Sequence, residues 1–200
     1  MEKPAKTEHP ILSLIAKRWS PRAFADKPVS GETLLSLFEA ARWAPSSSNL
    51  QPWSFIIAQK EKPEEFNRMA DCLAPSNQRW ARQVPVLVVA VAKMTLKRAD
   101  QVKPNRHAFY DTGQALALLS VQATEMGLFV HQMGGFDVAK TKETFHLPDD
   151  HEAAVMFAVG YAGDPETLPE DLKVRELEPR QRKPLSEFVF SGDWGKTAKL

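Results

Sequence analysis

The sequence has a single cysteine, Cys72, among its 200 residues. One cysteine forms no internal disulfide bond, and it excludes a zinc site built from cysteine ligands. Cys72 lies in "EEFNRMADCLA", a stretch that predicts an amphipathic helix, so we interpret it as a small apolar core residue. Long apolar runs are also missing. The longest, "VPVLVVAVA", is far shorter than the roughly 20 residues that a membrane-spanning helix needs.

A secretory signal and an excess of charge are missing as well. The amino-terminal "MEKPAKTEHP" has no apolar core of the kind that such a signal needs. The 26 Lys and Arg nearly balance the 25 Asp and Glu, so no overall field favours nucleic acid or a membrane surface. We therefore expect a cytoplasmic protein with no nucleic-acid or membrane partner. Any anionic ligand must then be recognised by a local group of cations.

Several catalytic motifs are absent too. The chain has no G-x-G-x-x-G after a strand, no G-x-x-x-x-G-K-[ST] and no G-x-S-x-G. These absences argue against a classical dinucleotide fold, a phosphate-binding P-loop and an α/β-hydrolase serine. The cluster "HLPDDHE" (146–152) contains metal-ligand residue types, but its proline and its place after a helix favour a solvated turn, and we predict no metal site. Paired carboxylates do not stand out, so the side chains offer no obvious chemistry of their own.

The apolar pattern predicts one domain over residues 1–200, with a core of about 10–163 in which helices and strands alternate. The run 84–92 is almost continuously apolar and β-branched, which is typical of a central strand covered on both faces. Ser30 and Asp137 are expected helix caps, and Gly127 an expected helix end. The expected helices are 11–20, 30–43, 63–73, 107–126 and 137–147, and the expected strands are 53–59, 84–92, 128–131 and 153–163.

Two other segments carry separate expectations. Residues 164–200 are rich in proline and charge, with one compact apolar group, "LSEFVF", so we expect a tail that wraps over the domain or over a second subunit. The segment "KMTLKRADQVKPNRH" (93–107) is basic. It is either a solvated loop or a mobile cover near the site, whose charge would favour the extra phosphate of NADPH.

Four polar segments could together bind an anionic, planar ligand. Each alone has an ordinary interpretation as a solvated helix end, a polar turn, a glycine turn or surface charge. Together they are complementary, because arginines can fork around one phosphate while Ser and Asn suit the edge of a polar ring. A glycine pair also lets backbone N–H groups approach a flat ligand. The segments are "KRWSPRAF" (17–24), "APSSSN" (44–49), "HQMGGFD" (131–137) and "EPRQRKPL" (178–185).

In this order the segments resemble the FMN-dependent nitroreductases, over Ile11 to about Val189. The motifs that carry the resemblance are "RWSPRAF", "PSSSNLQPW", Asp111-x-Gly113, "GGFD" and "VGY". The resemblance implies an α+β nitroreductase-like fold with a mixed, mainly antiparallel central sheet flanked by helices. It also implies an obligate homodimer with FMN at the interface and an extended carboxyl-terminal tail that wraps the dimer partner.

The resemblance further implies which residues meet the cofactor. A basic residue near Arg79, or a neighbour such as Ser76 or Asn77, would reach the pyrimidine side of the ring. Some members carry a glutamate at the position of Gly134, so here the flavin N5 would be served by backbone N–H groups alone. The implied contacts to phosphate and ribityl chain are Arg18, Trp19, Ser20, Arg22, Arg180 and Arg182; those from the other subunit are Pro45, Ser46, Ser47 and Asn49, with Ser48 as spacer; the backbone near N5 is that of Gln132, Met133, Gly134 and Gly135.

The activity implied is that of an FMN-dependent NAD(P)H oxidoreductase. NAD(P)H would pass a hydride to the flavin N5, and a nitroaromatic, a quinone or a similar acceptor would then take the electrons in ping-pong fashion. No side-chain acid, base or nucleophile is expected to be essential. Two alternatives stay open: a flavin-binding or sequestering protein without turnover, and another flavin oxidoreductase on this fold, such as a dehalogenating or flavin-consuming enzyme.

Overall fold

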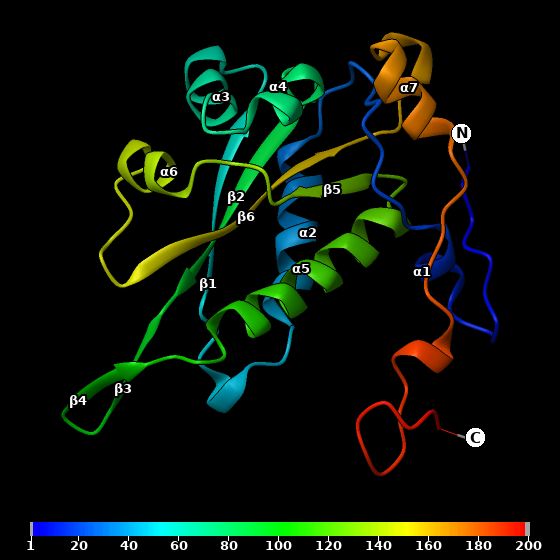
Figure 1. The fold of residues 1–200 in the computed structure, drawn as a ribbon. Coiled ribbons are helices and arrows are strands. Elements are labelled where there is room, and N and C mark those ends of the chain that lie inside the picture. Colours follow the sequence, from blue (N-terminus) through cyan, green and yellow to red (C-terminus); the bar gives the residue numbers. More distant parts are fainter. Residues whose placement is uncertain (1, 199–200) are drawn as a thin grey trace.

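The structure, a computed structural model that describes residues 2–198, is built on a four-stranded sheet in the order β1, β2, β6, β5 (Figure 1). All neighbouring strands pair antiparallel. β2 and β6 are central, and β2 is buried along almost its whole length, which confirms the predicted central strand. β5 lies at one edge of the sheet, so its outer side pairs with no other strand of this sheet within residues 2–198. The bounds are β1 (Trp53–Gln59), β2 (Val86–Lys93), β5 (Phe129–Met133) and β6 (His151–Gly160).

Helices cover both faces of this sheet (Figure 1). One face packs against α2 (Gly31–Arg42) and α5 (Ala108–Glu125), and the other lies under α3 (Pro63–Ala70), α4 (Pro75–Ala81) and α6 (Val138–Thr144). Successive β2 side chains alternate between the two cores, so both sets must be apolar. No helix among residues 2–198 is long and apolar enough to cross a bilayer.

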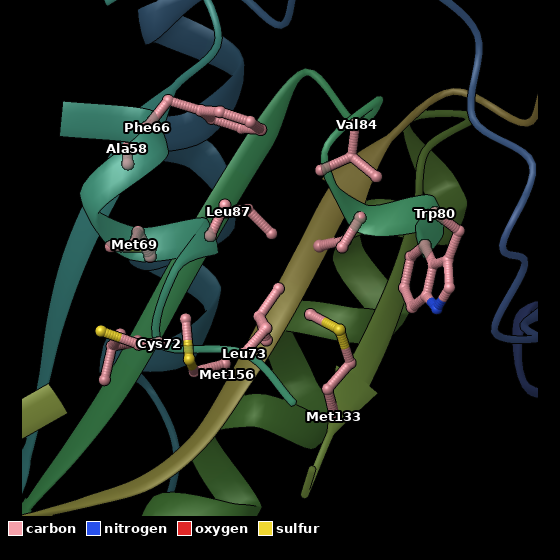
Figure 2. Close-up of a cluster of buried hydrophobic side chains, with 14 of the residues drawn as sticks. Ala58, Phe66, Met69, Cys72, Leu73, Trp80, Val84, Leu87, Met133 and Met156 are labelled. Atoms are coloured by element: carbon pink, nitrogen blue, oxygen red, sulfur yellow. The ribbon is translucent and has the colours of Figure 1, made fainter. Parts of the chain in front are cut away.

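Figure 2 shows the core on the α3 and α4 side, where Phe66 and Met69 lie beside Leu87 of β2 and Trp80 extends the cluster at the far right of the view. Cys72 is fully buried in this cluster, and its Sγ lies 3.4 Å from the carbonyl oxygen of Arg68. The interpretation of this cysteine as an apolar core residue is confirmed.

The predicted helix signals have the expected geometry. The Ser30 Oγ accepts a hydrogen bond from the Thr33 N–H at 3.2 Å, and an Asp137 Oδ1 accepts one from the Lys140 N–H at 2.9 Å. These bonds satisfy donors that a helix start leaves unpaired. Gly127 follows α5 at φ +74°, a conformation that glycine adopts without strain.

Three features were not predicted: a helix before β2, a hairpin after β2 and a helix in the tail. α4 is one short helix in a stretch without a side-chain cap, and the basic segment after β2 forms a hairpin, β3 (Thr95–Arg98) and β4 (Gln101–Pro104), where a loop was expected. The tail contains α7 (Glu170–Leu177), which packs back on the domain through Leu172. Its charged sequence has no apolar stripe, so periodicity gives no signal for it. This packing agrees with a tail that lies over the domain, whereas wrapping of a partner stays a prediction.

Candidate functional site

A cavity of about 220 Å³ lies where the amino-terminal segment, the loop after α1 (Ser13–Lys17), the end of α7 and the tail meet. In Figure 1 these segments gather on the right, beside the start of β5. Every residue assigned above to the phosphate and ribityl chain lines this one cavity. They are Arg18, Trp19, Ser20, Arg22, Arg180 and Arg182. The structure thus joins two distant segments that the sequence related only through complementary chemistry and the resemblance.

The cavity carries concentrated positive charge. Burial lowers the pKa of the Arg18 guanidinium, and the nearby positive charges of Arg180 and Arg182 lower it further. Burial also lowers the pKa of Arg180, again with a contribution from Arg182. Like charges held this close repel one another, and an anion between them relieves that repulsion. The Trp19 indole Nε1 is a buried hydrogen-bond donor that has no acceptor among residues 2–198.

The loop that carries Arg18 to Arg22 is held from two sides. The His131 Nδ1 lies 2.7 Å from the Pro21 carbonyl oxygen; since a carbonyl only accepts, Nδ1 carries the hydrogen and donates it. A Glu176 Oε1 on α7 accepts hydrogen bonds from the N–H groups of Arg22 at 2.8 Å and Ala23 at 3.1 Å. His131 comes from the edge strand β5, so the loop is fixed between β5 and α7.

β5 connects this cavity to the predicted glycine pair. The Trp19 ring packs edge-on against Phe129 at the start of β5, with ring centroids 5.9 Å apart, and Gly134 and Gly135 follow the other end of the strand. The Gly135 carbonyl oxygen accepts hydrogen bonds from the Asn77 Nδ2 and the Ala74 N–H, each at 2.9 Å. Gln132 and both glycines are exposed. The Met133 side chain is buried, so only the backbone of Met133 could contact a ligand.

Arg79 is not part of the cavity lining. Its guanidinium forms a two-point ion pair with the Asp171 carboxylate of α7, at 2.6 and 2.8 Å, and that bond raises the pKa of Arg79. Of the neighbours considered for the pyrimidine edge, Ser76 is exposed and Asn77 touches the Gly135 backbone. The contact of Arg79 with a flavin stays a prediction.

The "PSSSN" segment forms a short 3₁₀ turn, η1 (Ser47–Asn49), at the start of α5. The Ser47 N–H donates to an Asp111 Oδ2 at 3.0 Å, and the Gln51 N–H donates to the Ser46 Oγ at 3.0 Å. Asp111 is buried and lies in the first turn of α5. Sequence reasoning placed Asp111 in a motif but missed its role as the anchor of this turn.

Within one chain this turn and the cavity lie at opposite ends of α5. Phe129, which packs against Trp19 of the cavity, follows the end of that helix (Figure 1). α5 has 18 residues, and at a rise of about 1.5 Å per residue it is roughly 27 Å long. The structure therefore unites the phosphate-side residues and leaves Pro45 to Asn49 away from them.

Residues 15–161 match the model of the Nitroreductase family. The chain belongs to the nitroreductase family. It is similar to a crystal structure described as an oxidoreductase containing FMN, with a TM-score of 0.91, 35% identity and 96% of each chain covered. This nitroreductase-family chain is also similar to an uncharacterised 15.4 kDa protein of Mycolicibacterium smegmatis, with 32% identity over 66% of the chain and 86% of that protein. A Ralstonia nicotianae protein provisionally named NADH dehydrogenase/NAD(P)H nitroreductase shares 27% identity over 62% of the chain and 70% of its own length.

Proposed function

We propose that this nitroreductase-family protein is an FMN-dependent oxidoreductase that takes electrons from NAD(P)H and passes them to nitroaromatic, quinone or similar acceptors. The observation that carries the proposal is the gathering of all the predicted phosphate-side residues around one cavity. The similar solved structure described as containing FMN supports the same cofactor.

The residues present fit the phosphate of FMN. Guanidinium groups offer paired N–H donors whose geometry matches phosphate oxygens. Five arginines line the cavity with the Ser20 hydroxyl, against two carboxylates, Glu176 and Glu178. Trp19 also lines the cavity, and its Nε1 is a neutral N–H donor without a partner among residues 2–198. Burial lowers the pKa of Arg18 and the charges of Arg180 and Arg182 lower it further, so a ligand with negative charge would be favoured beside it.

FMN, when bound, supplies the electron chemistry between the nicotinamide and the acceptor. The chain contributes position and electrostatics. Arg18, Arg22 and Arg180 would hold the phosphate, and the exposed backbone that follows β5 at Gly134 and Gly135 would face the ring. Gly134 has no side chain that could contact the ring, so this backbone would contact it only through its own polar groups, of which the N–H groups are the donors. No side chain in this arrangement needs to act as an acid, base or nucleophile.

We further propose a homodimer in which the turn Pro45 to Asn49 completes the partner's site. The separation of this turn from the cavity along α5 supports two subunits, because one bound flavin is shorter than that helix. Large apolar side chains are exposed on α5, on and beside α1, and in the tail, which is typical of surfaces that a partner covers. They include Phe109, Tyr110, Leu118, Leu12, Ile15, Phe188 and Trp194.

The experiment is a spectrum and a titration. The purified protein is expected to be yellow or to take up added FMN, NADH or NADPH should bleach it in the absence of oxygen, and a nitroarene or quinone should restore the colour. A colourless protein that ignores FMN contradicts the proposal. A yellow protein that neither nucleotide bleaches would instead be a flavin-binding module without turnover.

A further inference from the structure

The amino-terminal segment is tied into the candidate phosphate cavity through Lys3. The Lys3 carbonyl oxygen accepts a hydrogen bond from an Arg180 Nη1 at 2.7 Å, and the same nitrogen donates to the Ala16 carbonyl oxygen at 2.8 Å. The Ala5 N–H donates to that Ala16 oxygen as well, at 2.8 Å. The segment is therefore seated against α1 and the tail rather than extended into solvent.

The Lys3 side chain lines the cavity with the arginines. Its Nζ donates to the Glu176 carbonyl oxygen and lies 4.9 Å from the centroid of the Trp19 ring. An ammonium group has three N–H donors, and this carbonyl is its one hydrogen-bond acceptor among residues 2–198. Two donors are left for a ligand in the cavity.

We propose that Lys3 is a further binding residue for the phosphate, so that FMN is held by three chain segments: the amino-terminal segment, the loop after α1 and the tail. This inference rests on the proposed function. The charges around Lys3 are mixed: burial lowers the pKa of Lys3, the negative charges of Glu176 and Glu178 oppose this, and the positive charges of Arg180 and Arg22 add to it. The lining carries six cationic side chains and only two carboxylates, so a bound phosphate would offset the remaining positive charge.

The test compares FMN with riboflavin, which has the same ring and ribityl chain but no phosphate. Full-length protein freed of flavin is titrated with each ligand, and Kd is read from quenching of flavin fluorescence. Lys3→Met should raise Kd for FMN about tenfold, as expected for the loss of one charge-assisted contact, while Kd for riboflavin stays within about twofold. Lys6→Met is the matched control, because Lys6 is exposed and lies outside the cavity lining. It should change neither value.

Lys3→Arg separates charge from packing, since it keeps the cation and should keep the wild-type preference for FMN over riboflavin. An unchanged Kd for FMN in Lys3→Met would overturn the proposal. An equal loss for both ligands would overturn it as well, because Lys3 would then only support the fold. A wild-type protein that binds neither ligand would contradict the proposed function itself. A wild-type protein that binds both ligands equally leaves the flavin site in place but overturns the role given to the phosphate contacts.

Discussion

A Glu176 Oε1 accepts a hydrogen bond from the Arg22 backbone N–H at 2.8 Å, and this contact joins α7 to the loop of the candidate phosphate cavity. The Glu176 side chain is 1% exposed. Its other oxygen, Oε2, has no hydrogen-bond partner among residues 2–198, and the Arg22 Nη1 lies 3.8 Å away from it. Burying a carboxylate costs desolvation free energy, and the hydrogen bonds from Arg22 and Ala23 offset part of that cost. We infer that Glu176 fixes the backbone from which Arg22 reaches the cavity.

Glu176→Ala should therefore destabilise the fold. The substitution leaves the N–H groups of Arg22 and Ala23 buried without an acceptor, at about 1–3 kcal/mol each. We expect the free energy of unfolding, measured by urea titration with circular dichroism, to fall by about 2–4 kcal/mol. Glu178→Ala is the control, because Glu178 is exposed on the same stretch, and it should stay within about 0.5 kcal/mol of wild type. A Glu176→Ala protein as stable as the control would contradict the inference.

His131 makes stability depend on pH. Burial, with a smaller contribution from the Arg22 charge, lowers the pKa of its imidazole to about 4, although hydrogen bonding to the backbone of Pro21 and Ser20 opposes this. In the unfolded chain the pKa is about 6.5, so between pH 6.5 and 4 the unfolded state binds the proton and the folded state does not. Stability should thus fall as the pH is lowered through this window, with no further loss from His131 below pH 4.

His131→Asn tests this linkage, because an asparagine amide can still donate to the Pro21 carbonyl but does not titrate. The wild-type protein should lose up to about 3 kcal/mol more than His131→Asn between pH 6.5 and 4, measured by urea titration at each pH. His146→Asn serves as the control, since the His146 side chain is exposed, and it should follow the wild-type curve. Parallel curves for wild type and His131→Asn would rule out His131 as the source.

Gly163 allows a close approach next to the same loop. A Cβ at this position would lie 2.5 Å from the carbonyl carbon of Phe24 and 2.8 Å from the Ala25 nitrogen, and both are backbone atoms that have little freedom to move. We expect Gly163→Ala to lower the free energy of unfolding by about 3 kcal/mol. At Gly134 a Cβ would meet nothing within 4 Å, so Gly134→Ala should be neutral or stabilise by up to about 1 kcal/mol. Equal effects at the two glycines in the same urea titration would disprove this contrast.

The sequence predicted those parts of the fold in which burial repeats with a fixed period. The continuous apolar run of β2 could be interpreted alone, because only a strand between two cores needs apolar residues on both sides. α7 escaped prediction because its buried residues are one leucine, Leu172, and one acid, Glu176, which binds backbone N–H groups far away in the chain. A single acid in a charged helix gives no periodic signal. The residue type of Glu176 does not reveal that it binds the backbone N–H groups of Arg22 and Ala23.

For the candidate site, resemblance supplied what periodicity could not. Nothing in the spacing of Arg18 and Arg180 shows that they line one cavity. Their complementary chemistry suggested a shared anionic ligand, and the resemblance assigned both to its phosphate side before the structure placed them together. It could not foresee local competition. Asp171 forms an ion pair with the Arg79 guanidinium. Lys3, which lines the cavity, lies in a segment that the family motifs do not cover. Contacts that depend on side chains outside the motifs were therefore the ones missed.

Within the turn "PSSSN", the role of Ser48 can be tested apart from the roles of Ser46 and Ser47. Ser48 has φ 51°, in the left-handed region that costs a residue with a side chain about 1 kcal/mol, and the sequence assigns it as a spacer rather than a flavin contact. Ser48→Gly should relieve this strain and raise the free energy of unfolding by about 0.5–1 kcal/mol, whereas Ser48→Ala keeps the strain and should give no gain. If Ser48 is only a spacer, both variants should also bind FMN with the wild-type Kd in a fluorescence titration. A Kd raised several-fold in both would show that the hydroxyl touches the cofactor, because their backbone preferences differ and the lost oxygen is what they share.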